Sequence, residues 1–390
     1  MQVVAETWLV LQLTHSGFAV GVAAALQFAP MLIGGAWGGL IADRFDKRRL
    51  LVVTQTAMAL PALALLALTA TGAIELWMLY LLICARGAVN AVDNPARQAF
   101  LVELVGPERL VNAVSLGSAL VNGARTLGPA VAGIVIATIG VVPCFGLNAL
   151  SFAAMLLALR GMDTAALRPV KPTVRKPGQV RNGLRYARAT PELWIPLTLM
   201  AIVGTFTFNF QTLLPLLATF GYGGGAGSYA MLTTAMGLGA IAGAVANGAR
   251  SRVRPALLVG AAAVFGALVI AAAAAPNVAI AAIALVPVGA ASVIFAASVN
   301  SFLQLAVAPH MRGRVMALYS IVFMGSTPIG GPLMGWIAGT AGPRTALALG
   351  GLVALGAATW ARATFARVGL EESAPPVSGD TTPAHARAIA

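Results

Sequence analysis

The sequence predicts an all-α membrane protein built from two six-helix bundles. Its 390 residues are 59% hydrophobic, with a mean hydropathy of +0.86, whereas soluble domains are about 45–50% apolar. Long apolar runs rich in Leu, Ala and Gly lack the alternation of strands, and a backbone in lipid must bond internally, as helices do. The basic residues lie between alternate runs, which is typical of multi-pass membrane proteins.

A membrane-spanning helix requires about 20 mostly apolar residues, and the runs predict twelve spans in two sets of six. The expected spans are 1–13, 17–40, 50–71, 76–95, 111–137 and 141–160, then 193–219, 227–248, 256–275, 277–300, 315–340 and 345–365. The first covers only roughly 20 Å at 1.5 Å per residue, against a hydrocarbon core of about 30 Å. We therefore expect the first helix to be truncated in this sequence.

Charge position predicts the orientation. If the loop between the second and third spans is cytoplasmic, nearly all of the 25 Lys and Arg residues face the cytoplasm or lie in its linkers, and Arg344 alone falls on the other side. The positive-inside rule favours this topology. The expected domains are an N-terminal bundle at 1–160, a basic cytoplasmic linker at 161–192 with a surface helix near 180–189, a C-terminal bundle at 193–366, and a disordered cytoplasmic tail at 367–390.

Several function classes are excluded by composition. The formal net charge of +13 follows from membrane topology, so we expect no nucleic-acid partner. Cys84 and Cys144 lie inside apolar runs, and the three histidines show no ligand spacing, which predicts neither a disulfide nor a metal site. The sequence has no phosphate-binding loop and no nucleophile triad, so we expect no enzyme activity and no cofactor.

Charged residues inside the spans are few, and the functional candidates among them lie in the N-terminal bundle: Glu6, Arg86, Asp93 and Arg125. Such residues are costly in lipid and usually functional or paired. Since burial favours the protonated form of a carboxylate, Glu6 and Asp93 are the proton-coupling candidates. In the alternative interpretation, Glu6 is permanently paired with an arginine of the fourth or fifth span, and Asp93 braces a gate or caps the following segment.

Substrate or charge-pair candidates are the polar residues of otherwise apolar spans. They are Arg86, Arg125, Asn122, Asn209 and Gln211. Arg125 is suited either to an anionic substrate or to an ion pair with Glu6. For the amides, hydrogen bonds between helices are the competing interpretation.

The two halves of the sequence repeat weakly. Gly128-Pro129 in the fifth span has a counterpart in Gly331-Pro332 of the eleventh, and Gly133 follows in the fifth. Small residues allow close helix approach and proline bends a helix, so these positions predict a hinge in the two spans. Ordinary small-residue packing is the alternative. Repeated six-helix halves predict a substrate cavity between them near the bilayer midplane.

The stretch 39–51, GLIADRFDKRRLL, is a charged cluster between two apolar runs and predicts a short water-facing hinge. It resembles the signature G-x-L-A-D-R-x-G-R-K-x-x-L of major facilitator superfamily transporters, with Asp46 in place of the second Gly. This resemblance implies the major facilitator fold. It also implies a cytoplasmic gate in which the motif latches the two bundles at the start of the eleventh span. The gate residues are Gly39, Asp43, Arg44, Lys47 and Arg48.

Two further stretches, 94–105 (NPARQAFLVELV) and 122–130 (NGARTLGPA), resemble the enterobactin exporter, or transmembrane secretion effector, group of this superfamily. The glycines around Gly128-Pro129 are similar to the antiporter motif of proton-driven drug exporters. The resemblance implies proton-coupled export of a siderophore or drug-like molecule across a bacterial inner membrane by a monomer. The alternatives are facilitated or proton-coupled uptake of a small solute, with Glu6 structural, and a non-transporting membrane scaffold or sensor.

Overall fold

The computed structural model describes residues 1–163, 179–248 and 254–369, which are helical and contain no strand. At Asp43, Asn122 and Arg125 it describes the backbone alone. The elements are α1 (Gln2–Thr14), α2 (Gly17–Arg44), α3 (Lys47–Ala70), α4 (Leu76–Val105), η1 (Pro107–Arg109), α5 (Leu110–Ile139), α6 (Val142–Gly161), α7 (Gln179–Ala189), α8 (Pro191–Phe206), α9 (Phe210–Leu216), η3 (Leu217–Gly221), α10 (Ala226–Gly248), α11 (Pro255–Ala273), α12 (Val278–Ala306), η4 (Pro309–Met311), α13 (Arg312–Ala341) and α14 (Pro343–Arg367).

The prediction of an all-α membrane protein is confirmed. Ten helical segments of the described chain are long and apolar enough to cross a bilayer, the seventh predicted span being counted as one segment, Pro191–Gly221. The other two predicted spans correspond to α1, which has 13 residues, and α5, which has 30 residues and an apolar stretch at Leu127–Ile139.

Two spans continue well beyond their predicted ends at 95 and 300. α4 extends to Val105 and α12 extends to Ala306. Pro95 lies inside α4 and cannot donate to the carbonyl of Ala91. That carbonyl lies against Gly38 of α2, where an added Cβ would be 2.1 Å from the oxygen. The missing side chain at Gly38 therefore allows two backbones to approach closely at the point where proline interrupts the hydrogen bonds of α4.

The hinge predicted at 39–51 is shorter in the structure. α2 continues to Arg44, and α3 begins after the turn Phe45–Asp46. The Asp46 carboxylate accepts a hydrogen bond of 2.7 Å from the backbone N–H of Arg49, and it therefore caps α3. The acid that replaces the second Gly of the motif thus has a local structural role.

The seventh span, predicted as one helix at 193–219, is interrupted between α8 and α9. The Thr207 hydroxyl donates to the carbonyl of Gly350 on α14 at 2.8 Å, and the Asn209 amide donates to the carbonyl of Thr205 at 2.7 Å. Non-helical backbone at membrane depth is tolerated where protein groups satisfy it. Hydropathy did not detect this interruption, because the mean hydropathy of Pro191–Gly221 remains that of a membrane span.

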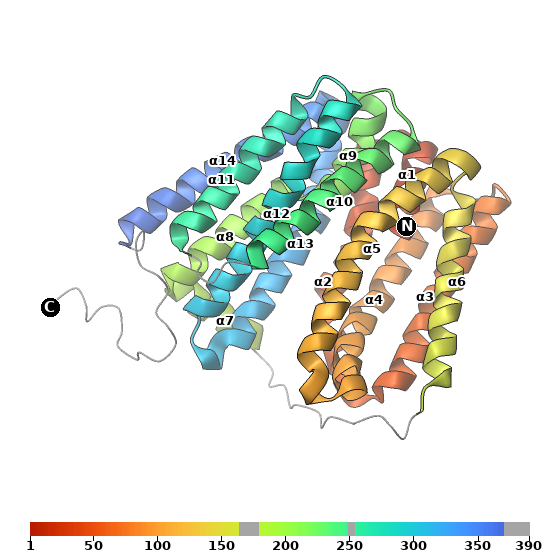
Figure 1. Cartoon of the computed structure of the whole chain (residues 1–390), viewed down its shortest axis with the longest axis horizontal. Helices are drawn as coiled ribbons and strands as arrows, with labels where there is room; N and C mark the ends of the chain where they lie inside the picture. The colour runs from red at the N-terminus through yellow and green to blue at the C-terminus, as the bar shows by residue number, and fades with distance from the viewer. Residues whose placement is uncertain (164–178, 249–253, 370–390) are drawn as a thin grey trace.

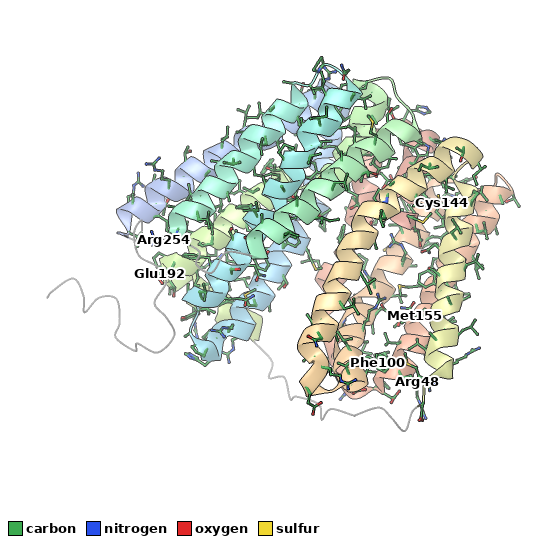
Figure 2. The ribbon with its side chains drawn as sticks, in the orientation of Figure 1. Arg48, Phe100, Cys144, Met155, Glu192 and Arg254 are labelled. Carbon is green, nitrogen blue, oxygen red and sulfur yellow. The ribbon has the colours of Figure 1, made fainter. Side chains whose placement is uncertain are left out.

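The two bundles contact each other mainly through two helix pairs, α2 with α13 and α5 with α10, and to a smaller extent through α9 with α1 and α2. Figure 1 shows the bundles meeting at the end that holds the α1–α2 turn and diverging toward the end that holds α7. We call these the far end and the linker end. Figure 2 places Arg48, at the start of α3, at the linker end of the N-terminal bundle.

Glycines bring α2 and α13 into backbone contact near the far end. A Cβ added to Gly21 would lie 2.2 Å from the carbonyl oxygen of Gly331, and one added to Gly335 would lie 2.2 Å from that of Gly17. Both helices therefore carry a pair of glycines four residues apart, the spacing that allows close packing of helices in membranes. We call this contact the glycine crossing.

Parts of the expected domain plan lie outside the described residues. These are 164–178 of the linker and 370–390 of the tail. α7 coincides with the surface helix expected near 180–189, and it contacts α13 and α8. The cation of Arg188, near the end of α7, lies 5.3 Å from the ring centre of Trp194 on α8, which joins the two helices.

Candidate functional site

A buried ion pair joins α1 to α4. The Glu6 side chain is 3% exposed, and its Oε2 lies 2.7 Å from Nη2 of Arg86. The other oxygen, Oε1, accepts a 2.6 Å hydrogen bond from the Gln2 amide, and Gln2 in turn accepts one from Asn148 of α6. Of the two partner helices left open by the sequence, the structure selects α4. The network ties three helices of the N-terminal bundle together.

The pair lies near the middle of the membrane. Glu6 precedes the far end of α1 by roughly 12 Å and Arg86 follows the far end of α4 by roughly 15 Å, at 1.5 Å per residue, and half of a hydrocarbon core is about 15 Å. Nε of Arg86 is buried and has no hydrogen-bond partner among the described residues. The guanidinium therefore holds Glu6 and retains one donor for another group.

Asp93 is also buried, but its hydrogen bonds are complete. Oδ1 accepts from the Thr54 hydroxyl at 2.7 Å and from the Gln55 amide at 2.8 Å, and Oδ2 lies 2.5 Å from Nη2 of Arg97. Because α4 continues well past this residue, Asp93 does not cap a following segment, and that alternative is wrong. The carboxylate binds α4 to α3, which makes it a weaker candidate than Glu6 for carrying protons.

Two contacts join the bundles at depths comparable to that of the ion pair. The Gln211 amide of α9 lies 3.5 Å from the Gln27 side-chain oxygen of α2. The rings of Trp8 on α1 and Tyr229 on α10 are stacked with centres 6.3 Å apart. Gln211 therefore lies on the seam between the bundles, as expected of a residue that meets substrate or senses the other bundle.

Asn209 lies inside the wall of the C-terminal bundle and not on the seam. It is 1% exposed, and a Cβ added to Gly330 of α13 would lie within 2.9 Å of both of its amide heavy atoms. Its Oδ1 has no hydrogen-bond partner among the described residues. This placement favours packing at the helix interruption over contact with substrate. The side chains of the other candidates, Asn122 and Arg125, lie outside the described residues.

The gate motif contacts its own bundle. Lys47 Nζ lies 3.6 Å from a carboxylate oxygen of Glu103 on α4. Arg48 donates to the carbonyls of Leu159 and Arg160 at the end of α6, at 2.7 and 3.2 Å. Figure 2 labels Arg48 at this end of the bundle, and Phe100 and Met155 belong to the apolar cluster packed there with Leu159. Gly39 lies in the last turns of α2 and Arg44 is its exposed last residue, whereas the Asp43 side chain is outside the described residues.

The predicted hinge residues lie inside α5 and α13. Pro129 and Pro332 are within these helices, directly after Gly128 and Gly331. Gly133 allows α5 to touch α10, because an added Cβ would lie 1.7 Å from that of Ala230. Sequence reasoning identified one glycine of the glycine crossing, Gly331, and missed its three partners. Their four-residue spacing in both helices is the signal that would have found them.

The repeated six-helix bundles, the small-residue seam between them and the buried ion pair at mid-depth define a membrane transporter of the major facilitator type. Solved structures agree on the fold. A single-residue mutant of the nucleoside transporter NupG has a TM-score of 0.74 at 13% identity, covering 93% of this chain and 94% of that one. A single-residue mutant of the peptide transporter POT has a TM-score of 0.74 at 12% identity, covering 94% and 91%.

The particular family follows from the sequence comparison. The profile of the transmembrane secretion effectors, a major facilitator family, matches residues 1–382, and the chain belongs to this family. It is 28% identical over 244 residues to the staphyloferrin A transporter of Staphylococcus aureus, across 60% of this chain and 59% of the relative. It is 27% identical over 327 residues to the enterobactin exporter EntS of Salmonella typhimurium, across 83% and 78%.

Coverage of some relatives is partial. The chain spans 59% of the staphyloferrin A transporter and 43% of the Bacillus subtilis transporter YfiS, which is 27% identical over 183 residues. The comparisons confirm the predicted resemblance and the transporter class. The family and the ten apolar helices of the described chain together show a multi-pass membrane protein.

Proposed function

We propose that this chain is a proton-coupled exporter of a siderophore or drug-like molecule that works by alternating access. The observation that carries the proposal is the buried Glu6–Arg86 pair at mid-depth of the N-terminal bundle. A buried carboxylate that can exchange a proton is the part that coupling requires. The similarity to a protein named an enterobactin exporter and to one named a staphyloferrin A transporter supports the substrate class.

In the proposed cycle, a proton and the substrate compete for the same ion pair. When a proton binds Glu6, the carboxylate becomes neutral and its attraction to Arg86 weakens. Without the proton, the charged pair binds the substrate: Glu6 accepts a hydrogen bond from it, and Arg86, whose Nε already lacks a partner among the described residues, donates to it. A proton that enters from outside therefore displaces the substrate there, and the loss of that proton to the cytoplasm restores the site for the next substrate. Each charge that moves down the membrane potential supplies about 2.3 kcal/mol per 100 mV.

The arrangement of the bundles suits the loading step of an exporter. The glycine crossing closes the far end, while the bundles diverge toward the linker end. With the basic linker end in the cytoplasm, this state admits substrate from the cytoplasm of a bacterial cell. In the opposite state, Asp43, Arg44, Lys47 and Arg48 would latch the linker end against the start of α13. The transporter acts as a monomer in the inner membrane, with linker and C-terminus cytoplasmic.

The test is transport by the purified chain in proteoliposomes with an imposed proton gradient. Iron-free enterobactin, staphyloferrin A and a panel of drug-like molecules are the substrates. We expect the gradient to drive uptake into acidic vesicles, because these mimic the external side. Glu6→Gln should abolish gradient-driven uptake, since glutamine resembles the protonated carboxylate and cannot exchange a proton. Glu75→Gln, at an exposed carboxylate of the α3–α4 turn, is the matched control.

A facilitator that takes up a small solute is the second candidate. It is favoured by the fact that both oxygens of Glu6 already have partners, as in a permanent structural pair. In that case substrate moves regardless of the gradient, and a folded Glu6→Gln variant keeps full transport. If the chain moves no substrate with or without the gradient, and Asp43→Asn behaves as the parent does, the chain is better explained as a non-transporting scaffold or sensor.

A further inference from the structure

A cavity of about 550 Å³ opens on the seam between the bundles at the far end. The α1–α2 turn from His15 to Phe18 forms one wall. The C-terminal bundle forms the other, with Phe220, Trp336 and Thr340 among its lining residues. The cavity lies next to the glycine crossing, because Gly17 belongs to both. Its volume is within the range of about 300–1,000 Å³ that holds drug-sized ligands.

The lining is suited to a neutral aromatic ligand. Phe18, Phe220 and Trp336 are 52%, 48% and 56% exposed, so a ligand ring placed among them would bury aromatic surface. No Asp, Glu, Lys or Arg of the described chain lines the cavity. The hydroxyls of Ser16 and Thr340 and the imidazole of His15 supply hydrogen-bonding groups at its margin.

Contacts of Arg344 hold the cavity wall that the C-terminal bundle forms. Arg344, which follows lining residue Pro343, donates to the carbonyl of Pro276 at 3.3 Å and lies 4.7 Å from the ring centre of Tyr222. Burial raises the pKa of the Tyr222 hydroxyl, and the nearby charge of Arg344 opposes this shift. These contacts join α14 to the loops after η3 and α11, so the wall moves as part of the bundle.

We propose that this cavity binds a small, neutral aromatic molecule, and that its occupation holds the far end closed. The walls belong to different bundles, so the cavity exists only while the bundles meet at this end. A ligand that binds one of two states shifts the population toward that state. The inference rests on the alternating access proposed above and adds a regulatory site separate from the Glu6–Arg86 pair.

The probe is N-phenylmaleimide, which supplies a phenyl ring and two carbonyl acceptors. It is attached to Thr340→Cys in full-length protein that also carries Cys84→Ser and Cys144→Ala, the thiol adding across the maleimide double bond. Thr138→Cys is the matched control. Thr138 occupies the equivalent place near the end of α5, is exposed, and like Thr340 donates to the carbonyl four residues earlier. It does not line the cavity.

The readout is hydrogen–deuterium exchange of the α1–α2 turn and of the glycine crossing. Burying a phenyl-sized group shifts an equilibrium by roughly tenfold or more. We therefore expect exchange at 15–21 and 331–342 to slow by about tenfold when the Thr340→Cys adduct forms. The Thr138→Cys adduct should leave the exchange rate as it was.

Three outcomes would overturn the inference: unchanged exchange, equal slowing with both adducts, or faster exchange with the Thr340→Cys adduct, which would mean that the ring forces the seam open. Exchange is measured without substrate or gradient. A failure of gradient-driven transport therefore counts against the proposed function alone. If transport is observed, the Thr340→Cys adduct should inhibit it and the Thr138→Cys adduct should not.

Discussion

The two bundles share a helix plan but differ in what holds them together. The N-terminal bundle contains ion pairs at three levels, Glu6–Arg86, Asp93–Arg97 and Lys47–Glu103. The predicted spans of the C-terminal bundle from the seventh to the eleventh contain no Asp, Glu, Lys or Arg. There, aromatic rings fill the interior. Phe265 lies 5.1 Å from Phe208 and 6.3 Å from Phe295, between ring centres.

This difference separates two tasks that a coupled transporter must perform. A buried ion pair depends on the charge of its carboxylate, because neutralising that charge removes the attraction, whereas aromatic packing involves no charged group. The N-terminal bundle is therefore suited to coupling and the C-terminal bundle to acting as a rigid body. Changes to the N-terminal ion pair should alter transport and stability together, and changes to the C-terminal rings should alter stability alone.

The largest effect is expected from Arg86→Gln. It leaves the Glu6 carboxylate buried with only the Gln2 amide as a partner, and breaking a buried pair in this way costs about 3–5 kcal/mol. The double variant Glu6→Gln/Arg86→Gln removes the unpaired charge and should recover most of that stability without recovering gradient-driven transport. Thermal unfolding of the detergent-solubilised protein measures both. Equal stability of the single and double variants would show that the pair is not energetically coupled.

A smaller effect is expected from Asp93→Asn. The NH2 group of the asparagine faces side chains that also donate hydrogen bonds, and the charge-assisted hydrogen bonds of the carboxylate are lost. Such a loss costs about 1.5–3 kcal/mol of stability. The cost is smaller here because the Arg97 side chain is largely exposed. Transport per folded molecule should remain coupled to the gradient, because Asp93 braces α3 and α4. Asp46→Asn is the control, since asparagine caps a helix as well as aspartate does. Uncoupled transport by folded Asp93→Asn would make Asp93 a proton carrier.

The smallest effect of the three is expected from Phe265→Leu in the C-terminal bundle. Loss of its ring contacts costs about 1–2 kcal/mol, given about 0.5–1.5 kcal/mol for each aromatic pair. The melting temperature should fall while the dependence of transport on the gradient stays the same. Phe45→Leu, at the exposed α2–α3 turn, is the control. A changed gradient dependence in Phe265→Leu would break the proposed division between the bundles.

Most of the helix plan could be predicted from the sequence, because apolar length and basic loops determine it. The interruption between α8 and α9 could not, since hydropathy does not register whether a backbone group is bonded to its own helix. The continuation of α4 through Pro95 was also missed. It depends on Gly38 of another helix, a contact that no local pattern in α4 contains.

The candidate site was predicted in its parts but not in its pairing. Glu6 and Arg86 were selected because charges in spans are rare, and the structure brings them together. The sequence does not distinguish Arg86 from Arg125 as the partner of Glu6, because both α4 and α5 can lie close enough to α1 for an ion pair. Asn209 is a candidate for the same reason, because it is a polar residue in an apolar span. The structure buries it, because its amide instead bonds the Thr205 carbonyl at the interruption between α8 and α9.

The glycine crossing also bears on the speed and reversibility of a transport cycle. Gly17, Gly21, Gly331 and Gly335 have no side-chain rotamers, so parting and rejoining there costs no side-chain conformational entropy. Their Cα–H groups face carbonyl oxygens at distances that exclude a Cβ, as in the weak Cα–H···O contacts of close helix pairs. Because these contacts are individually weak, α2 and α13 can separate at the glycine crossing without leaving a deep energy minimum. Because the glycines are rigid and fit closely, the two helices pack again in the same register.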